Sequence, residues 1–357
     1  MKLVPQKGEI QKNLLHWFKR NARDLPWRRT RSPYAIWVSE IMLQQTQVPT
    51  VIPYYKRFLK TFPTVRRLAK ADLSEVLMVW EGLGYYSRAR NLHKASQEVL
   101  SRFKGKLPYT LNDLLSLPGI GRYTAGAILS IAFNKEAPIL DGNVKRVLSR
   151  LFAISNSPGR DKAEGLLWNF SETLIPKGQA GAFNQALMDL GSMICTPRDP
   201  QCIHCPLSRL CKAKTEGNPE KYPAREAKKR IPHIHAAGAV IQKNGEVLLT
   251  QRPPKGLLGG LWEFPNWKID CREGLQEQLK RWIKSELGIR VKSIKPLGSF
   301  NQTFSHFKLT LHVNLCHIHG EKKYGTWVPV RDLHLFPMSR LHRIIAQTIG
   351  EKFQQMQ

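Results

Sequence analysis

The feature that most constrains the fold is a change of hydrophobic pattern at about residue 235. From residue 8 to about residue 193, apolar residues recur at helical spacing, and proline and glycine separate the periodic segments. Examples of this spacing are Leu73, Val76, Leu77 and Trp80, and later Ala127, Ile128, Ile131 and Ala132. Beyond residue 235, short apolar runs and the alternating residues of 307–313 are typical of strands. The pattern predicts an all-α domain followed by an α+β domain.

The length and one polar segment place the domain boundaries. A chain of 357 residues is long enough for two domains. Residues 213–232 are rich in Lys, Glu, Pro and Ala and contain few residues that a core would bury, which is typical of a linker. We therefore expect one domain over residues 1–212, a linker over 213–232 and a second domain over 233–357.

The charge points to a polyanionic partner. The formal net charge is +29, with 32 Lys and Arg against 15 acidic residues in 1–212, and 24 against 12 in 213–357. Because both halves are basic, we expect both domains to face nucleic acid. The first residues carry no secretory signal, and no run approaches the roughly 18 apolar residues that span a bilayer. These observations predict a monomeric cytoplasmic protein without a membrane partner, associated with the nucleoid if bacterial.

The segment from Leu117 to Tyr123 has the composition of a tight turn between two helices. Gly119 and Gly121 lack Cβ atoms, so the chain can turn sharply and bring backbone N–H groups close to an anion. The next helix is predicted to open at Arg122. About 20 residues later, Asp141 lies at the start of another helix. A turn that can bind a DNA phosphate, followed by a carboxylate, suggests a protein that binds DNA and catalyses a reaction on it.

Four cysteines form a cluster in the sequence. Cys195, Cys202, Cys205 and Cys211 are separated by six, two and five residues, whereas Cys271 and Cys316 lie outside the cluster. In a cytoplasmic protein this spacing favours metal binding over disulfides. Both zinc and a 4Fe–4S cluster accept four thiolates. Because zinc sites usually contain two Cys-x-x-Cys pairs and this array has one, the spacing favours iron–sulfur.

Taken together, these motifs carry a family resemblance. The hairpin, Asp141 and the cysteine spacing resemble the helix-hairpin-helix DNA glycosylases of the endonuclease III superfamily, and residues 38–46 look like the MutY-type adenine glycosylases. The likeness runs from about Leu14 to Cys211 and resumes in the C-terminal half. It implies an all-α helix-hairpin-helix glycosylase domain, a 4Fe–4S cofactor held by the four cysteines, and double-stranded DNA with 8-oxoguanine:adenine mispairs as partner.

Two positions separate the branches of that superfamily. Relatives with lyase activity carry a Lys in the hairpin helix, where it attacks the sugar as a Schiff-base nucleophile. Here the matching residue is Tyr123, which cannot form an imine. Those relatives also carry Gln where this chain has Glu40. The resemblance therefore implies a monofunctional adenine glycosylase.

The resemblance also assigns the chemistry. It implies that Glu40 protonates N7 of adenine, while Asp141 stays ionised, stabilises the oxocarbenium cation and forms a transient covalent adduct. Tyr123 and Asn143 would position these groups and the attacking water. The apolar neighbours of Glu40, residues 41–43, predict a raised pKa.

Further site residues follow from the same likeness. The target base must leave the stack, and Gln45 and Tyr85 are the candidate wedges, whereas Tyr86 is expected to pack in the core. Arg28 and Gln185 match positions that line the adenine pocket. Gly119, Gly121 and Arg122 are the expected DNA contacts of the hairpin.

The C-terminal half resembles the Nudix, MutT-like fold over 260–265 and 281–289. A working Nudix motif holds Mg²⁺ with three glutamates. Here Trp282 and Ser285 replace two of them and only Glu286 remains, so we expect a scaffold that binds without hydrolysing. Phe304, Ser305 and His306 look like the loop with which MutY-type enzymes recognise 8-oxoguanine.

Three other functions fit parts of the sequence. A bifunctional glycosylase–lyase acting on oxidised pyrimidines would share the hairpin and the cysteines. A nucleotide-pool Nudix hydrolase would share the C-terminal fold. A non-catalytic iron–sulfur DNA sensor would bind tightly and release no base.

Overall fold

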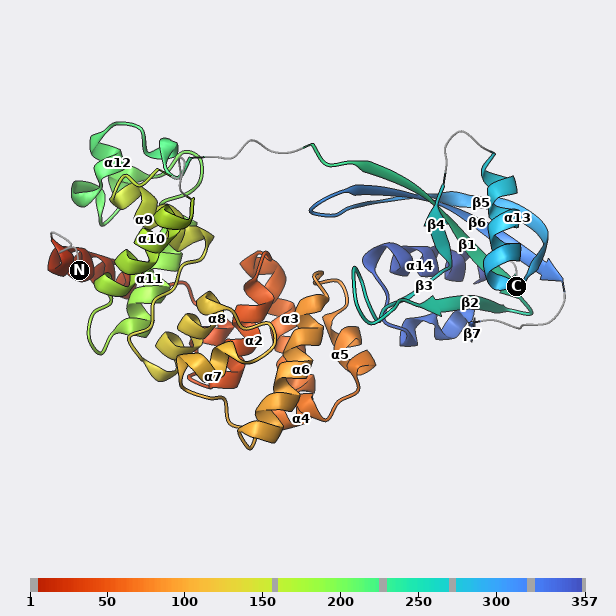
Figure 1. Ribbon diagram of the computed structural model, residues 1–357, viewed down its shortest axis with the longest axis horizontal. Coiled ribbons are helices and arrows are strands. Elements are labelled where there is room, and N and C mark those ends of the chain that lie inside the picture. Colours follow the sequence, from red (N-terminus) through yellow and green to blue (C-terminus); the bar gives the residue numbers. More distant parts are fainter. Residues whose placement is uncertain (1–5, 156–159, 225–229, 270–273, 320–324, 355–357) are drawn as a thin grey trace. The chain divides into compact units, whose positions relative to one another are not determined.

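The computed structural model describes residues 6–155, 160–224, 230–269, 274–319 and 325–354 (Figure 1). The chain divides into two compact units, Met1–Lys70 with Asn91–Ala227 (unit 1) and Ala71–Arg90 with Lys228–Gln357 (unit 2). Unit 1 is helical, and every strand of the described residues belongs to unit 2, as the change of hydrophobic pattern predicts. Within the described ranges, no helix is both long and apolar enough to cross a bilayer.

Two observations differ from the predicted boundaries. Residues 71–90, which lie inside the helical part of the sequence, pack with the C-terminal unit. The predicted linker is also shorter than expected, because Lys212–Thr215 form helix α12 and Pro219–Lys221 form a 3₁₀ turn. The side chain of Tyr222 is buried, and its carbonyl oxygen accepts a hydrogen bond from Arg150 Nε at 3.0 Å. Through the buried Tyr222, the end of the predicted linker therefore packs against unit 1.

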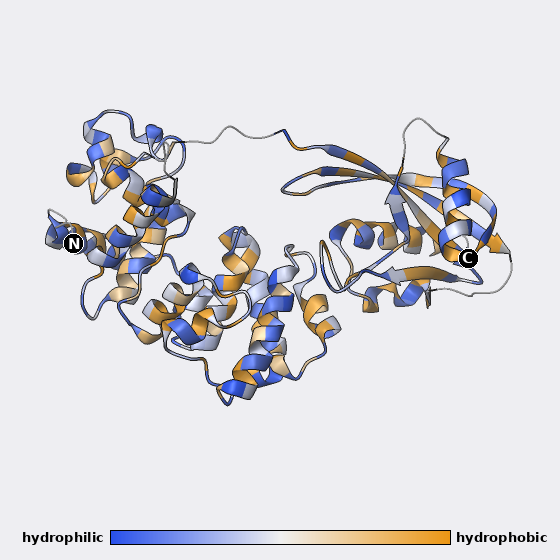
Figure 2. Cartoon of the chain, viewed as in Figure 1, coloured by the Kyte–Doolittle hydropathy of each residue, from blue (hydrophilic) through white to orange (hydrophobic). Residues whose placement is uncertain are grey.

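Unit 1 is a packing of helices joined by short turns. Its helices are α1 (Lys7–Asn21), α2 (Pro33–Leu43), α3 (Val48–Thr61), α4 (Val65–Ala69), α6 (Ser87–Arg102, whose first turn belongs to unit 2), α7 (Leu111–Leu115), α8 (Arg122–Ala127), α9 (Gly142–Leu151), α10 (Arg160–Leu174), α11 (Ala180–Met193) and α12. A π-helical turn, Ile128–Ala132, continues α8. Figure 2 shows hydrophobic and hydrophilic residues alternating along these helices. The apolar sides of α1, α9, α10 and α11 meet in one core.

The turn between α7 and α8 is the predicted hairpin. Gly119 has φ +78°, and a Cβ atom there would lie 2.7 Å from Cβ of Asn91, so glycine is required. Gly121 differs from the prediction, because its φ is −92° and a Cβ atom would meet nothing within 4 Å. Leu117 and Ile120 are buried and fix the turn to the helices. Of the two glycines, therefore, only Gly119 is required by the conformation of the turn.

Unit 2 is built on a mixed seven-stranded sheet. Its strands are β1 (His233–Lys243), β2 (Glu246–Gln251), β3 (Trp262–Glu263), β4 (Asn266–Lys268), β5 (Arg290–Thr303), β6 (Lys308–His319) and β7 (Thr326–Pro329). The order is β3-β2-β1-β6-β5, with β4 paired to β1 and β7 to β2, and β1 and β6 run parallel. Helix α14 (Arg340–Gln354) packs on one face and α13 (Leu275–Leu287) on the other, each over its own apolar cluster. Helix α5 (Leu73–Trp80) completes the unit.

Candidate active site and cysteine cluster

Glu40 lies near the end of α2, a helix that is apolar on almost every side. Ser32 caps its first turn, Pro33 begins it, and the nine residues from Tyr34 to Met42 are buried. The side chain of Glu40 is 3% exposed. The pKa of this carboxyl is raised to about 7, chiefly by burial; the charge of Asp141 also raises it, whereas the Tyr123 hydrogen bond and the charge of Arg28 lower it. The carboxyl can therefore hold a proton near neutral pH.

Tyr123 joins the hairpin to Glu40. Its hydroxyl lies 2.7 Å from Glu40 Oε2, to which it donates, and 3.4 Å from Sδ of Met188 on α11. Burial, followed by the charges of Glu40 and Asp141, raises the pKa of Tyr123 well above its usual value. The phenol consequently stays protonated and acts as a fixed donor.

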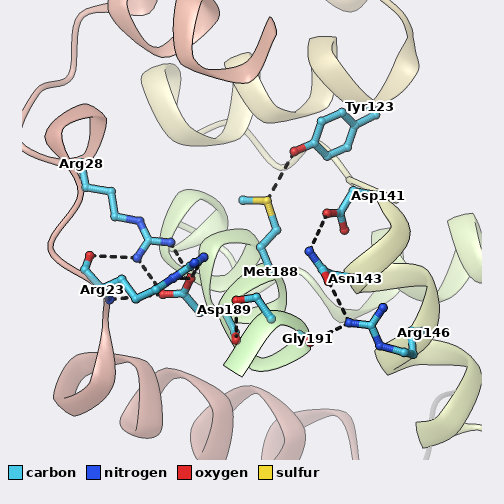
Figure 3. Close-up of polar contacts among 10 residues, drawn as sticks. Arg23, Arg28, Tyr123, Asp141, Asn143, Arg146, Met188, Asp189 and Gly191 are labelled. Carbon is cyan, nitrogen blue, oxygen red and sulfur yellow. Dashed lines mark hydrogen bonds and ion pairs between the residues drawn. The ribbon is translucent and has the colours of Figure 1, made fainter. Parts of the chain in front are cut away.

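Asp141 is the N-cap of α9. Its Oδ1 accepts the backbone N–H of Val144 at 2.7 Å, and its Oδ2 accepts Nδ2 of Asn143 at 3.2 Å (Figure 3). The family resemblance implies that Asp141 stays ionised, and the amides at a helix start favour that form. Instead, burial raises the pKa of Asp141, and the amides of Val144 and Asn143 together with Arg146 only partly offset that rise. The carboxyl is buried more deeply than a surface N-cap.

Arg146 connects Asn143 to the cysteine loop. Its Nη2 donates to Asn143 Oδ1 at 2.8 Å and to the Gly191 carbonyl at 2.6 Å (Figure 3). Its Nε donates to the Cys195 carbonyl at 2.7 Å. A Cβ atom on Gly191 would lie 2.6 Å from that of Asn143, so glycine allows α9 and α11 to approach. These contacts fix which way the Asn143 amide points.

A small cavity of about 50 Å³ lies beside Glu40 and is lined by Arg28, Gln185 and Met188. The Arg28 guanidinium donates to both oxygens of Asp189, at 2.6 and 3.0 Å, and is held in one orientation (Figure 3). Gln185 donates to the Gly181 carbonyl one helical turn earlier, at 3.1 Å. The structure therefore places both predicted pocket residues against Glu40.

The residues that orient this site are not among those predicted from the sequence. Asp189 is fully buried and binds both Arg23 and Arg28, and Met188 contacts Tyr123. One signal could have indicated Asp189, since it is the one acidic residue in the apolar sequence of α11. Arg146 gave no comparable signal, because a basic residue on an amphipathic helix is ordinary.

The four clustered cysteines lie near one another, and Cys195, Cys205 and Cys211 pack against the core of unit 1. The pKa values of Cys202, Cys205 and Cys211 are raised, first by burial and also by the neighbouring thiols, and that of Cys205 reaches about 12. Arg150 Nη1 lies 3.3 Å from Sγ of Cys195 and also donates to the Thr196 carbonyl at 2.7 Å. In the side-chain positions of the described residues, no three His, Cys, Asp or Glu groups already converge on one point. Cys271 lies outside the described residues, and Cys316 is buried in the sheet.

The remaining residues predicted to bind DNA in unit 1 are exposed. Gln45 follows α2 with φ +55°, a left-handed conformation that turns the chain sharply. Arg122 lies over the ring of Trp168, with 4.0 Å between the guanidinium carbon and the ring centroid. Both side chains are accessible to a partner.

In unit 2, Tyr85 and the loop of Phe304, Ser305 and His306 line one cavity of about 340 Å³. The loop closes the β5–β6 hairpin, where the Phe304 N–H donates to the Phe307 carbonyl at 2.8 Å and the two rings stack 4.5 Å apart. Ser305 and His306 are exposed. Tyr85 is 44% exposed and has φ +48°, whereas Tyr86 is buried as predicted. The structure thus brings together two motifs that lie more than 200 residues apart.

The remnant Nudix helix is α13. Trp282 stacks on Trp267 of β4 at a centroid distance of 4.1 Å and an angle of 7°. The hydroxyl of Ser285 donates to the Trp282 carbonyl at 3.1 Å. The indole of Trp282 and the bonded hydroxyl of Ser285 occupy positions where a Nudix enzyme has metal-binding carboxylates, so these two positions offer Mg²⁺ little.

Comparison with known families agrees with this architecture. Residues 38–173 match the HhH-GPD superfamily of base excision DNA repair proteins, and residues 236–348 match the NUDIX domain. Among solved structures, a thermostable thymine-DNA glycosylase is similar at a TM-score of 0.54 and 32% identity, covering 59% of this chain and 97% of that one. A trapped endonuclease III–DNA covalent intermediate is similar at 0.51 and 25%, covering 61% and 99%.

Over most of its length, the sequence is also similar to curated adenine DNA glycosylases. The adenine DNA glycosylase of Mus musculus is 38% identical over 85% of this chain and 70% of its own length. That of Homo sapiens is 36% identical, covering 94% and 73%. That of Buchnera aphidicola from Acyrthosiphon pisum is 40% identical and covers 84% of each.

Proposed function

Since the chain belongs to the adenine DNA glycosylases, enzymes of the helix-hairpin-helix superfamily that remove adenine in base excision repair, we propose how its residues do this and which mispair they select. The proposed substrate is adenine opposite 8-oxoguanine or guanine in double-stranded DNA. The proposed catalytic residues are Glu40, Tyr123, Asp141 and Asn143. One observation carries the assignment, namely the 2.7 Å hydrogen bond between the Tyr123 hydroxyl and the buried carboxyl of Glu40.

Glu40 is the general acid. Its protonated carboxyl transfers a proton to N7 of the flipped adenine, and the bond between C1′ and N9 then breaks with its electron pair leaving on the base. A pKa of about 7 supports this role, because the acid is protonated in a large share of molecules near neutral pH and still releases its proton readily. Tyr123 holds one carboxyl oxygen, so the other faces the substrate.

Asp141 stabilises the sugar cation that remains. Its ionised carboxylate lies beside C1′, and one oxygen forms a C1′–O bond until water, having given its proton to Glu40, displaces it. The positive charge that develops on the sugar favours the ionised form at the moment when it is needed, although burial opposes that form in the free protein. Asn143 fixes the carboxylate by the bond to Oδ2.

The decisive experiment is single-turnover excision from a duplex with one 8-oxoguanine:adenine pair. We expect free adenine and an intact abasic strand. Strand cleavage trapped by borohydride would instead indicate the glycosylase–lyase alternative, which the phenol at Tyr123 disfavours because it cannot form an imine.

We propose that the loop of Phe304, Ser305 and His306 reads the base opposite adenine. Exposure of the Ser305 hydroxyl at the rim of a cavity suits a hydrogen bond to the base edge where oxidised guanine differs. Ser305→Ala is expected to lower excision opposite 8-oxoguanine up to about tenfold, since one hydrogen bond contributes about 0.5–1.5 kcal/mol. Excision opposite guanine serves as the control, and equal losses on the two duplexes would remove this role from Ser305.

The hairpin glycines form a matched pair of variants. Gly119→Ala is expected to lower the free energy of unfolding by about 1–2 kcal/mol or more, because Ala at φ +78° is strained and its Cβ meets Asn91. Gly121→Ala is expected to leave the melting temperature unchanged but to weaken DNA binding about tenfold, since its Cβ would obstruct a phosphate on the backbone N–H groups. Unchanged DNA affinity in Gly121→Ala would show that phosphate does not approach there.

We also propose that Cys195, Cys202, Cys205 and Cys211 hold a 4Fe–4S cluster. Burial and the neighbouring thiols raise the pKa of Cys202, Cys205 and Cys211, which suits a cationic centre that binds them as thiolates. The Arg150 guanidinium at Cys195 suits a sulfur carrying negative charge. Such a cluster would cross-link the loop that follows α11, and no step of base excision is assigned to it.

The metal content tests this proposal. Purified protein is expected to contain about four iron and four sulfide per chain and to absorb visible light. Cys202→Ser should lower both iron content and visible absorption, while Cys316→Ser, outside the cluster, should change neither. One zinc per colourless chain would contradict the iron–sulfur assignment.

A further inference from the structure

The turn that carries Tyr85 is bonded to the C-terminal part of unit 2 by an ion pair between Glu81 and Arg343. We propose that Glu81 and Arg343 are positioning residues that hold Tyr85 against the loop of Phe304, Ser305 and His306, and thereby set the preference for the base opposite adenine. This inference rests on the proposed function of that loop. It concerns two residues that touch neither the flipped adenine nor the catalytic carboxyls.

Glu81 is bound at both carboxylate oxygens. Arg343 Nε donates to its Oε1 at 2.5 Å, and Arg343 Nη2 and the Met338 backbone N–H donate to its Oε2 at 2.9 and 3.0 Å. Both side chains are less than a fifth exposed. A two-point, partly desolvated pair of this kind fixes orientation as well as distance. Surface ion pairs such as Lys280–Glu277 lack this geometry.

Arg343 is also held by two backbone carbonyls, independently of Glu81. Its Nη1 donates to the Leu333 carbonyl at 2.8 Å, and its Nη2 also donates to the Phe336 carbonyl at 2.6 Å. Both carbonyls belong to the stretch that leads into α14. These bonds fix the orientation of the guanidinium, which in turn binds the Glu81 carboxylate.

The rest of the turn is tied to the same stretch. The Tyr86 hydroxyl donates to the Met338 carbonyl at 3.1 Å and accepts the Gly82 N–H at 3.2 Å. Trp80 Nε1 donates to the Gly84 carbonyl at 3.0 Å, and Gly82 and Gly84 both have positive φ. The left-handed residues give the turn its shape, and Glu81 and Tyr86 fix it in place.

A third set of hydrogen bonds comes from Arg90, in the first turn of α6. Arg90 Nη1 donates to the Gly259 carbonyl at 2.8 Å and its Nη2 to the Gly256 carbonyl at 3.3 Å. Residues from this loop, from the Tyr85 turn and from 302–306 line the same 340 Å³ cavity. A base edge or backbone that enters the cavity meets all three segments, so a small shift of the turn changes the fit of the recognition loop.

The test compares Glu81→Gln, Arg343→Ala and the double variant with Glu277→Gln, which weakens an exposed ion pair of the same unit. Single-turnover excision is measured on duplexes with 8-oxoguanine or guanine opposite adenine. We expect each single variant to lose about tenfold opposite 8-oxoguanine and less than about threefold opposite guanine. The double variant should be no worse than either single one, because the two residues act through one contact. Glu277→Gln should match the wild type.

Amide hydrogen exchange gives a second readout that does not depend on catalysis. In Glu81→Gln, exchange at Met338 and over residues 82–87 is expected to rise, and in Glu277→Gln it is expected not to change. An unchanged ratio of the two excision rates in both single variants, or equal losses on both duplexes, would overturn this inference alone. A wild-type enzyme that shows no preference for 8-oxoguanine would overturn the proposed recognition loop first, and this inference with it.

Discussion

Replacement of Glu40 by glutamine is expected to lower the single-turnover rate of adenine excision by about a hundred- to ten-thousandfold, the usual contribution of a general acid. Glutamine fills the same volume and still accepts the Tyr123 hydroxyl through its carbonyl oxygen. It has no proton to transfer to N7, so the base must leave as an anion. The measurement is release of adenine from an 8-oxoguanine:adenine duplex under enzyme excess.

The pH dependence follows from the same carboxyl. Excision by the wild type is expected to fall as pH rises through about 7, because the fraction of protonated Glu40 falls. Since the folded-state pKa lies above the unfolded value, folding takes up a proton between about pH 4.5 and 7. The stabilisation that results is complete below pH 4.5 and is lost as pH rises through 7.

Glu40→Gln should therefore be more stable than the wild type at pH 8, by roughly 3 kcal/mol from a shift of this size. At pH 5 the difference should be small, and binding to the lesion duplex should be retained. A variant that keeps excision within tenfold of the wild type would show that Glu40 is not the acid. Loss of both activity and stability at pH 8 would indicate damage to the fold instead.

The sequence predicts individual residues of this site better than it predicts their surroundings. The apolar run around Glu40 indicates burial, and burial is the first cause of its raised pKa. Asp141 is implied to stay ionised and lies at a helix start, yet burial raises its pKa more than the cap lowers it. Desolvation depends on what packs over a residue from distant parts of the chain, and local spacing does not contain that information.

The same reasoning explains why the compact units differ from the predicted domains. Helical spacing places 71–90 with the other helices, but the contacts of Glu81 and Tyr86 are made to residues more than 250 positions later. Polar composition predicts a linker from residue 213, yet Tyr222 and the buried Ala213 anchor that stretch. Composition averages over a segment, whereas one or two buried side chains decide where it packs.

The second large effect is expected from Asp141→Asn, which should lower excision by about a hundred- to a thousandfold. Asn still accepts the Val144 N–H and remains a good N-cap, and the relief of a buried charge offsets the lost bond from Asn143, so the melting temperature should change little. Its neutral amide can neither stabilise the cation electrostatically nor form the C1′–O bond. Asp141→Ala provides the structural control, because it should add a loss of stability of about 1 kcal/mol from the missing cap.

The stereochemistry at C1′ separates the two roles of Asp141. If its carboxylate bonds to C1′ and a second nucleophile displaces it, the product retains the configuration of the substrate; direct attack on the face opposite the leaving adenine inverts it. With methanol as the trapping nucleophile, the wild type is expected to give the retained methyl glycoside. Inversion in the wild type, with Asp141→Asn still impaired, would leave Asp141 as an electrostatic stabiliser only. Excision by Asp141→Asn within tenfold of the wild type would remove both roles, and the chemistry would then rest on Glu40 and water alone.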